Sequence, residues 1–394
     1  MNRPHLMILA GEASGDAHAA EFVESLRKHR PDIRISGMGG KAMIRSGVEV
    51  FFDSSIIAVV GLIEVLRHWG DIRRAMAIVR QRLEESRPDL LVLVDYPEFN
   101  LKMARHAKAL NIPVLFYISP QVWAWRPRRI HKIGRLIDHM AVIFRFEKRY
   151  YEDAGIPVSF VGHPLVGKVS ASRDRMQTRA RLGIDPDQQT IGLFPGSRHS
   201  EISRLLPLMF ATARQLQSQD AGLRFVLPVA ESLDYEAIAR QAGHSGVDIQ
   251  VTRDGIYDVI TACDAIVTCS GTVTLEIALL GTPMCIVYKV APLTYWIMKR
   301  LVTIPHIGLV NIVAQREVVR ELLQADANPG KVATELRRLL DDRAYRADIG
   351  EGLEQVCHKL ETGNGAQGMA GLIDSLLAQT GSANDTSENG RQDD

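Results

Sequence analysis

The stretches LMILAGEASGD, residues 6–16, and IGLFPGSR, residues 191–198, share one plan. In each, we expect an apolar strand to end at a glycine-bearing turn and a helix to begin directly after it. A helix that begins at the carboxyl end of a strand favours bound anions there, because its first N–H groups are free and its dipole is positive. Two such turns, one in each half of the chain, indicate a nucleotide-linked substrate held in a cleft.

Apolar runs rich in Val, Ile and Leu recur between amphipathic stretches along the rest of the chain. This alternation predicts parallel sheets covered by helices, which is the α/β class. The runs lie at residues 90–94, 114–118, 140–144, 225–227, 265–268 and 284–287.

The length of 394 residues favours two domains, each large enough to bury a core. The strand pattern breaks in the polar stretch SASRDR at residues 170–175. We therefore place the junction there, between a first domain at 1–168 and a second at 169–345. The segment 381–394 contains almost no apolar residue, which predicts a disordered tail.

Composition argues against several classes of protein. The 47 basic and 46 acidic residues give a net charge of +1, so no overall field attracts nucleic acid. The four cysteines form no CxxC pair and stand in or near apolar runs, which predicts reduced thiols and no zinc site. We expect neither a membrane span nor a signal peptide, because no apolar run reaches about 18 residues and no basic region precedes the first strand. The protein is expected to be soluble or peripherally bound.

GMGGKA at residues 37–42 fits the G-x-G-x-x-A spacing of dinucleotide-binding turns, but it follows the second expected strand rather than the first. The turn at 11–16 has glycines four residues apart and is not followed by Gly-Lys-Ser, so it is no Walker A loop. We favour tight, crowded turns over an NAD site.

Asp95 ends the apolar strand in LVLVDYPEFN, residues 91–100, at the edge where α/β sheets bind ligands. Its carboxylate is a candidate general base. A helix N-cap or a turn acid before Pro97 is an equally good interpretation, and Asn100 could cap as easily as bind.

The stretch SPQVWAWRPRRIHK, residues 119–132, gathers two tryptophans and a cluster of cations. Nucleic acid could use such stacking and charge, but a single patch on a neutral protein favours an anionic membrane surface. A solvated helix face is an alternative for the outer arginines. The apolar stretch IIAVVGLIEVLRHW, residues 56–69, is either a lipid-contacting helix or a helix buried on both sides.

A further strand-to-helix opening in the second half is SGTVTLE, residues 270–276. Arg198 stands where a diphosphate would bind, and Ser270 or Thr272 can cap the helix. Glu276, one turn inside it, can accept both hydroxyls of a ribose. The alternative for Glu276 is a capping-box or first-turn acid.

Six motifs follow one another along the chain: GEASGD (11–16), DYP (95–97), SPQVWAWR (119–126), FVGHPL (160–165), PGSR (195–198) and SGT (270–272). Together they resemble the motifs of the lipid-A-disaccharide synthase family. The resemblance implies a GT-B fold, with two Rossmann-like domains facing across a cleft and helices at 346–380 packing back on the N-terminal domain. It also implies an inverting transfer from UDP-2,3-diacylglucosamine to 2,3-diacylglucosamine 1-phosphate, giving UDP and the β-1,6-linked disaccharide of lipid A without metal or cofactor.

By this resemblance Asp95 takes the proton of the acceptor hydroxyl. Arg198 and the amides after Gly196 and Gly271 would balance the charge on the departing UDP, and Glu276 would hold its ribose. The residues with an implied role in sugar or UDP binding are Glu12, Ser14, Gly15, Asp16, Gly196, Ser197, Arg198, Ser270, Gly271, Thr272, Glu276, Asn311, Glu321 and Gln324.

The chain departs from the family pattern at Val310 and Arg320, where prolines are common, and at FRFE, residues 144–147. These departures concern the loops around Asn311 and Glu147. Roles for His18, Glu147 and Trp296 stay open.

Acylated substrates favour the lipid-contacting interpretation of residues 56–69 and a headgroup role for the basic cluster. The candidate lipid or membrane contacts are Ile57, Val60, Leu62, Ile63, Leu66, Trp69, Arg128 and Arg129. We then expect a monomer or homodimer bound peripherally at the cytoplasmic face of the inner membrane. Rival hypotheses are a transferase or epimerase acting on a soluble UDP-sugar, an NAD oxidoreductase and a noncatalytic nucleotide-binding regulator.

Overall fold

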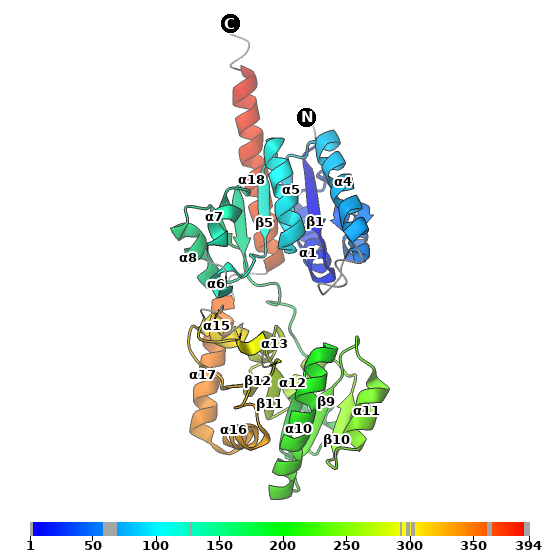
Figure 1. The fold of residues 1–394 in the computed structure, drawn as a ribbon, viewed down its shortest axis with the longest axis vertical. Helices are drawn as coiled ribbons and strands as arrows, with labels where there is room; N and C mark the ends of the chain where they lie inside the picture. Colours follow the sequence, from blue (N-terminus) through cyan, green and yellow to red (C-terminus); the bar gives the residue numbers. More distant parts are fainter. Residues whose placement is uncertain are drawn as a thin grey trace. The chain divides into compact units, whose positions relative to one another are not determined.

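The computed structural model describes residues 3–57, 69–125, 128–291, 294–296, 300, 304–360 and 365–389. The chain divides into two compact units, the first formed by residues 1–166 and 360–394 and the second by residues 167–359. In each unit helices flank a parallel sheet (Figure 1).

The first unit is built on a seven-stranded parallel sheet with the order β3-β2-β1-β4-β5-β6-β7. The order reverses between β1 and β4, so the loops after these strands form the crevice in which such sheets bind ligands. The strands are β1 (His5–Ala10), β2 (Arg34–Gly39), β3 (Glu49–Asp53), β4 (Leu90–Val94), β5 (Val114–Tyr117), β6 (His139–Val142) and β7 (Val158–Phe160).

Helices cover this sheet, and this is why its central strands are continuous apolar runs. The described helices of the first unit are α1 (Ala13–His29), α2 (Lys41–Arg45), the 3-10 helix η1 (Ser54–Ile56), α4 (Trp69–Ser86), α5 (Pro97–Ala109), α6 (Val122–Trp125), α7 (Arg129–Gly134), α8 (Arg145–Asp153) and α18 (Gly365–Asn389).

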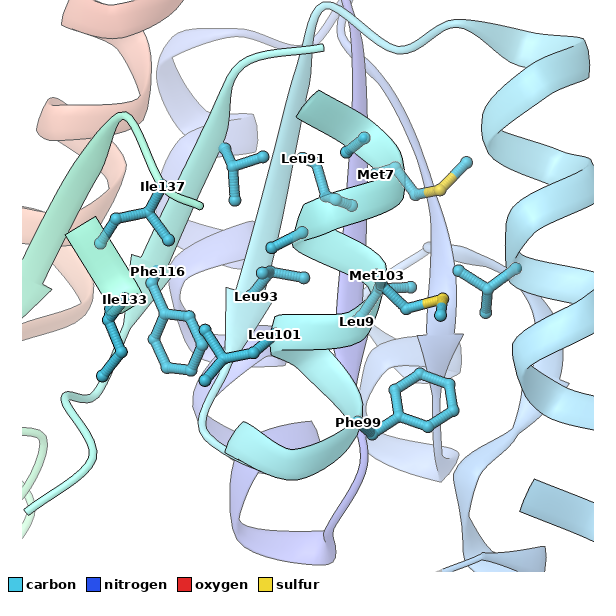
Figure 2. Close-up of a cluster of buried hydrophobic side chains, with 14 of the residues drawn as sticks. Met7, Leu9, Leu91, Leu93, Phe99, Leu101, Met103, Phe116, Ile133 and Ile137 are labelled. Carbon is cyan, nitrogen blue, oxygen red and sulfur yellow. The ribbon is translucent and has the colours of Figure 1, made fainter. Parts of the chain in front are cut away.

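Alternation along the strands divides the core of the first unit into two layers. Leu9 of β1 and Leu93 of β4 pack in one layer against Met103 of α5, as Figure 2 shows. Ile8 and Val92 pack in the other layer. Both faces of the sheet are therefore buried.

The C-terminal helix α18 completes the second of these layers. Its Met369 and Ile373 join the cluster that contains Phe22 of α1, and the two helices lie together. Gly368 permits a close approach, because a Cβ atom there would lie 2.2 Å from the carbonyl oxygen of Val161. The segment that belongs to the first unit begins at residue 360, whereas the expected returning helices begin at 346.

The second unit is built on a six-stranded parallel sheet with the order β10-β9-β8-β11-β12-β13, and its order reverses between β8 and β11. Its strands are β8 (Thr190–Phe194), β9 (Arg224–Pro228), β10 (Ile249–Thr252), β11 (Ala265–Cys269), β12 (Met284–Tyr288) and β13 (Glu321–Leu323). Its described helices include α9 (Arg175–Arg181), α10 (His199–Gln219), α11 (Tyr235–Gly243), α12 (Ile256–Ala262), α13 (Val273–Leu279), α15 (Leu309–Ala314), α16 (Pro329–Asp341) and α17 (Arg343–Leu360).

The polar stretch at 170–175 folds onto the second unit through the buried carboxylate of Asp258. This carboxylate accepts hydrogen bonds from the amides of Ser172 and Arg173, at 2.6 and 3.1 Å. The stretch is therefore polar because it forms hydrogen bonds to Asp258 at the point where the second unit begins.

Three further observations bear on the expectations from composition. Cys263, Cys269 and Cys285 are buried and Cys357 is half-buried, and no disulfide bond joins these four residues. In the part of the chain that the structure describes, no helix is long and apolar enough to cross a membrane. Helix α18 extends to Asn389, into the segment for which a disordered tail was expected.

Candidate functional site

Asp95 follows directly on β4, whose Val94 pairs with Ala10 of β1 at the reversal of strand order. Asp95 and Tyr96 both adopt left-handed backbone conformations, with φ of +47° and +46°. Non-glycine residues rarely adopt this conformation, and such strain persists where the surrounding fold imposes it, commonly at functional sites. Tyr96, not Asp95, is the N-cap residue of α5, so the N-cap interpretation of Asp95 is not supported.

Asp95 lines a cavity of about 280 Å³ with Pro97, Ile118, Ser119, Pro120, Gln121, Val122 and Arg129. Ile118, just after β5, also has a positive φ of +66°, which is unusual for a β-branched residue. Strain therefore occurs at the ends of two neighbouring strands that border one cavity.

Burial raises the pKa of Asp95, and the amide of Tyr96 and the nearby His18 partly offset this effect. Burial together with the negative charge of Asp95 raises the pKa of Glu12. A carboxylate with a raised pKa is a stronger base once it is deprotonated. The geometry and the electrostatics of Asp95 thus suit a general base, with Glu12 beside it.

Gly11 and Tyr96 form a close contact that shapes the turn after β1. A Cβ atom at Gly11 would lie 2.1 Å from the Tyr96 ring, so the ring occupies the space that any larger residue would need. The Tyr96 hydroxyl donates a hydrogen bond of 3.1 Å to the carbonyl of Ile57. Glu12 and Ser14 are exposed at the beginning of α1, where they can contact a ligand, whereas Gly15 is buried.

Asp16, for which a role in sugar or UDP binding was expected, forms hydrogen bonds within the first unit. Its carboxylate accepts hydrogen bonds from the amides of Gly40, Ala42 and Met43, at 2.6, 2.9 and 3.1 Å, and the side chain is buried. Asp16 therefore anchors the N-terminus of α2, and its contact with a sugar stays a prediction. The same bonds occupy the amides of Gly40 and Ala42 in the turn at 37–42, which leaves these two unavailable to a dinucleotide phosphate.

The tryptophan-bearing motif packs inside the first unit at Trp123. The indole N–H of Trp123 donates to the Glu147 carboxylate at 3.0 Å, and the amide of Phe144 donates to the other oxygen at 3.2 Å. Burial raises the pKa of Glu147 to about 7. Glu147 is therefore a structural support for α6, whose Val122 lines the Asp95 cavity.

The candidate lipid contacts have different surroundings. Ile57 is fully buried in the core, so its expected role as a lipid contact is corrected. Trp69 is 48% exposed. Arg128 is exposed, and Arg129 forms an ion pair of 2.8 Å with Glu98. The remaining candidates, Val60, Leu62, Ile63 and Leu66, lie outside the described residues.

The second unit contains a cavity of about 480 Å³ at the carboxyl edge of its sheet. It brings together seven residues that the sequence assigned to UDP binding: Gly196, Ser197, Arg198, Ser270, Gly271, Thr272 and Glu276. Pro228 to Ala230 and Arg253 to Ile256, from the loops after β9 and β10, complete its wall. Sequence reasoning did not identify these two loops, because they contain no recognisable motif.

Glu276 lines this cavity and accepts a hydrogen bond of 3.2 Å from the hydroxyl of Tyr257. Burial raises the pKa of Glu276, and burial and Glu276 raise the pKa of Tyr257 to about 12. A carboxylate held in this way can accept further hydrogen bonds from hydroxyl groups of a ligand.

Glu201 occupies the N-terminus of α10 and was missed by the sequence analysis. One carboxylate oxygen accepts from the amides of Ser197 and Arg198, at 3.1 and 3.2 Å, and the other accepts from the Arg198 guanidinium at 2.9 Å. Position 196, beside Glu201, requires glycine. Its backbone φ is +109°, and a Cβ atom there would lie 2.2 Å from the Glu201 carboxylate. An acid in the first turn of a helix is favoured by the helix dipole, and this signal could have identified Glu201.

Asn311 and Glu321 bind backbone groups of their own unit. The fully buried Asn311 accepts from the amides of Val318 and Val319 and donates to Glu321 at 2.8 Å. Glu321 also accepts from Gly308 and Ile307 at the beginning of α15. These contacts give both residues a structural role, and their expected contacts with sugar or UDP stay a prediction.

Gln324 has a similar role. Its amide oxygen accepts from the Val290 amide at 3.1 Å and its amide nitrogen donates to the Val290 carbonyl at 3.3 Å. Neither this residue nor Asn311 nor Glu321 lines the 480 Å³ cavity. Among the residues that the structure describes, no group of three or more His, Cys, Asp or Glu could hold a metal ion.

Comparison with known proteins shows the family of this chain. The family model described as Lipid-A-disaccharide synthetase matches residues 6–364. A lipid-A-disaccharide synthase of Geobacter sulfurreducens is 50% identical over 374 residues, which are 95% of this chain and 97% of that protein.

Two solved structures share the fold alone. A putative UDP-N-acetylglucosamine 2-epimerase from Listeria monocytogenes has a TM-score of 0.65 at 14% identity, covering 96% of this chain and 98% of its own. The glycotransferase of kitacinnamycin has a TM-score of 0.63 at 17% identity, covering 96% and 100%. The expected GT-B fold of two parallel-sheet domains is confirmed. The chain belongs to the lipid-A-disaccharide synthase family and is a glycosyltransferase of lipid A synthesis.

Proposed function

We propose that Asp95 is the general base of a transfer from UDP-2,3-diacylglucosamine to the 6-hydroxyl of 2,3-diacylglucosamine 1-phosphate. The observation that carries this proposal is the strained, largely buried carboxylate of Asp95, which lines a cavity at the strand-order reversal. A base in this position contributes typically about 10²- to 10⁴-fold to a rate.

The displacement is a single step with inversion. The acceptor oxygen forms a bond to the anomeric carbon as its proton moves to the Asp95 carboxylate, and the bond between that carbon and the UDP oxygen breaks. The products are the β-1,6-linked disaccharide 1-phosphate and UDP. Glu12, beside Asp95, is positioned to accept a hydrogen bond from a sugar hydroxyl.

UDP binds in the 480 Å³ cavity of the second unit in this proposal. Glu276 accepts hydrogen bonds from the ribose hydroxyls. Arg198 and the amides at the beginning of α10 balance the charge that develops on the diphosphate. Because Glu201 accepts hydrogen bonds from these same groups in the structure, it must release them when the diphosphate binds.

The acylated substrates place the enzyme at a membrane surface, and we propose peripheral binding at the cytoplasmic face of the inner membrane. The half-exposed ring of Trp69 and the exposed Arg128 and Lys132 support this proposal. Charge reversal at Arg128 and Lys132 should reduce sedimentation with anionic vesicles. Unchanged sedimentation would contradict the role of these two cations.

The reaction is tested by incubating the purified protein with both acylated sugars in detergent and measuring UDP and disaccharide by mass spectrometry. We expect equal amounts of the two products, formed only when both substrates are present and in the presence of EDTA. Turnover of a soluble UDP-sugar without the acylated pair would contradict the proposal and favour the soluble-sugar alternative.

A further inference from the structure

Arg129 lines the same 280 Å³ cavity as Asp95. Of the described residues around this cavity, Arg129 is the cation, and Ser119 and Gln121 supply uncharged polar groups. A guanidinium beside a general base is unexpected if its role is to contact a membrane surface.

The contacts of Arg129 show that its charge is not directed at the base. Its guanidinium pairs with Glu98 at 2.8 Å. The charge that lowers the pKa of Asp95, against the effect of burial, is that of His18. The Arg129 side chain is only 19% exposed, whereas its partner Glu98 is 79% exposed. A shielded cation is thus paired with a solvated carboxylate. Ion pairs that reach solvent typically contribute only about 0.2–1 kcal/mol, so a ligand can displace Glu98 at little cost.

We propose that Arg129 binds the 1-phosphate of the acceptor sugar, displacing Glu98. This inference rests on the proposed function and names the group that selects the acceptor. Donor and acceptor carry the same diacylated glucosamine, so the phosphate monoester is the feature that distinguishes the acceptor in the Asp95 cavity. The planar guanidinium can form two parallel hydrogen bonds to phosphate oxygens.

The test is direct binding of 2,3-diacylglucosamine 1-phosphate, and of the same sugar without phosphate, in detergent. We expect the wild-type protein to prefer the phosphorylated sugar by about 10- to 100-fold, since hydrogen bonds to charged groups contribute about 1.5–3 kcal/mol. R129A should bind both sugars with equal affinity. E98Q should increase the preference, because it weakens the competing partner without removing Arg129.

Arg149→Ala is the matched control, because it also removes an arginine from an ion pair in the first unit, with Asp153 at 3.6 Å. This variant should keep the wild-type preference. A preference that persists in R129A, or a loss of affinity for both sugars alike, would overturn the assignment.

The transfer assay separates this inference from the proposed function. In steady-state kinetics, R129A should raise the KM for the acceptor and leave the KM for the UDP-sugar unchanged. An R129A enzyme with the wild-type acceptor KM would overturn the phosphate site and leave the transfer intact. An Arg129-dependent preference in a protein that releases no UDP would support the phosphate site and contradict the proposed function.

Discussion

The indole N–H of Trp123 donates a hydrogen bond of 3.0 Å to the carboxylate of Glu147, and both side chains are buried. The amide of Phe144 donates to the second carboxylate oxygen. One carboxyl group therefore connects α8 to α6, whose Val122 lines the Asp95 cavity.

Replacing Glu147 by alanine should destabilise the first unit. The change leaves two buried N–H groups without an acceptor, and each such group costs about 1–3 kcal/mol. We expect E147A to lower the free energy of unfolding by about 2–5 kcal/mol in urea denaturation. Arg149→Ala, which removes an exposed ion pair from the same helix, should cost less than about 1 kcal/mol. Equal stability of the two variants would contradict the support role of Glu147.

Glu147 should also make stability depend on pH. Its pKa is raised from 4.5 to about 7 in the folded protein, so the folded state binds more protons than the unfolded state between these values. The contribution of Glu147 to stability is therefore complete below about pH 4.5 and is lost as the pH rises to about 7. The urea midpoint of the wild type, measured relative to that of E147Q, should therefore decrease as the pH rises through this interval. A constant difference between the two proteins would show that Glu147 is ionised throughout.

Asp16 should act on stability rather than on substrate affinity. D16A removes the acceptor of three amide hydrogen bonds at α2, so we expect a loss of about 2–4 kcal/mol in the free energy of unfolding. UDP affinity, measured by calorimetry below the unfolding transition, should be unchanged. Ser14→Ala is the comparison, because Ser14 lies in the same turn of α1 and is exposed. A stable D16A protein would contradict the anchoring role.

The sequence predicted the parts of the fold and site that depend on local patterns. Continuous apolar runs identified β4 and β11, and the residues that follow them, Asp95 and Ser270, are at the expected sheet edges. The carboxyl ends of parallel strands meet at one edge. Seven of the expected UDP contacts therefore line one cavity.

Other features depend on partners that are distant in the sequence. Asp16 binds amides that lie 24 to 27 residues away, and nothing in the turn at 11–16 indicates them. The left-handed conformation of Asp95 was equally unpredictable, because no glycine marks it. Pro207 lies inside the helix α10, although proline removes a backbone hydrogen bond from a helix interior.

Glu276 should contribute to affinity for the ribose. Replacement by glutamine keeps the shape but removes the charge, and hydrogen bonds to charged groups contribute about 1.5–3 kcal/mol. We expect E276Q to weaken UDP binding by about 10-fold or more in calorimetry. The variant and the wild type should bind 2′,3′-dideoxyuridine diphosphate equally, since that ligand lacks both hydroxyls. A similar loss for both ligands would show that Glu276 acts through the fold of the cavity.

The most direct test of the central claim is the pH dependence of turnover in the wild type and in Asp95→Asn. Asparagine tolerates the left-handed backbone and keeps the size of the side chain, but it cannot accept the proton. We predict that the kcat of the wild type falls on its acidic limb with a midpoint above the pH at which an exposed aspartate titrates. The reason is that burial raises the pKa of Asp95. D95N should lose about 10²- to 10⁴-fold in kcat without this limb, while UDP affinity stays unchanged. A D95N enzyme with near wild-type kcat and the same acidic limb would contradict the role of Asp95 as the base.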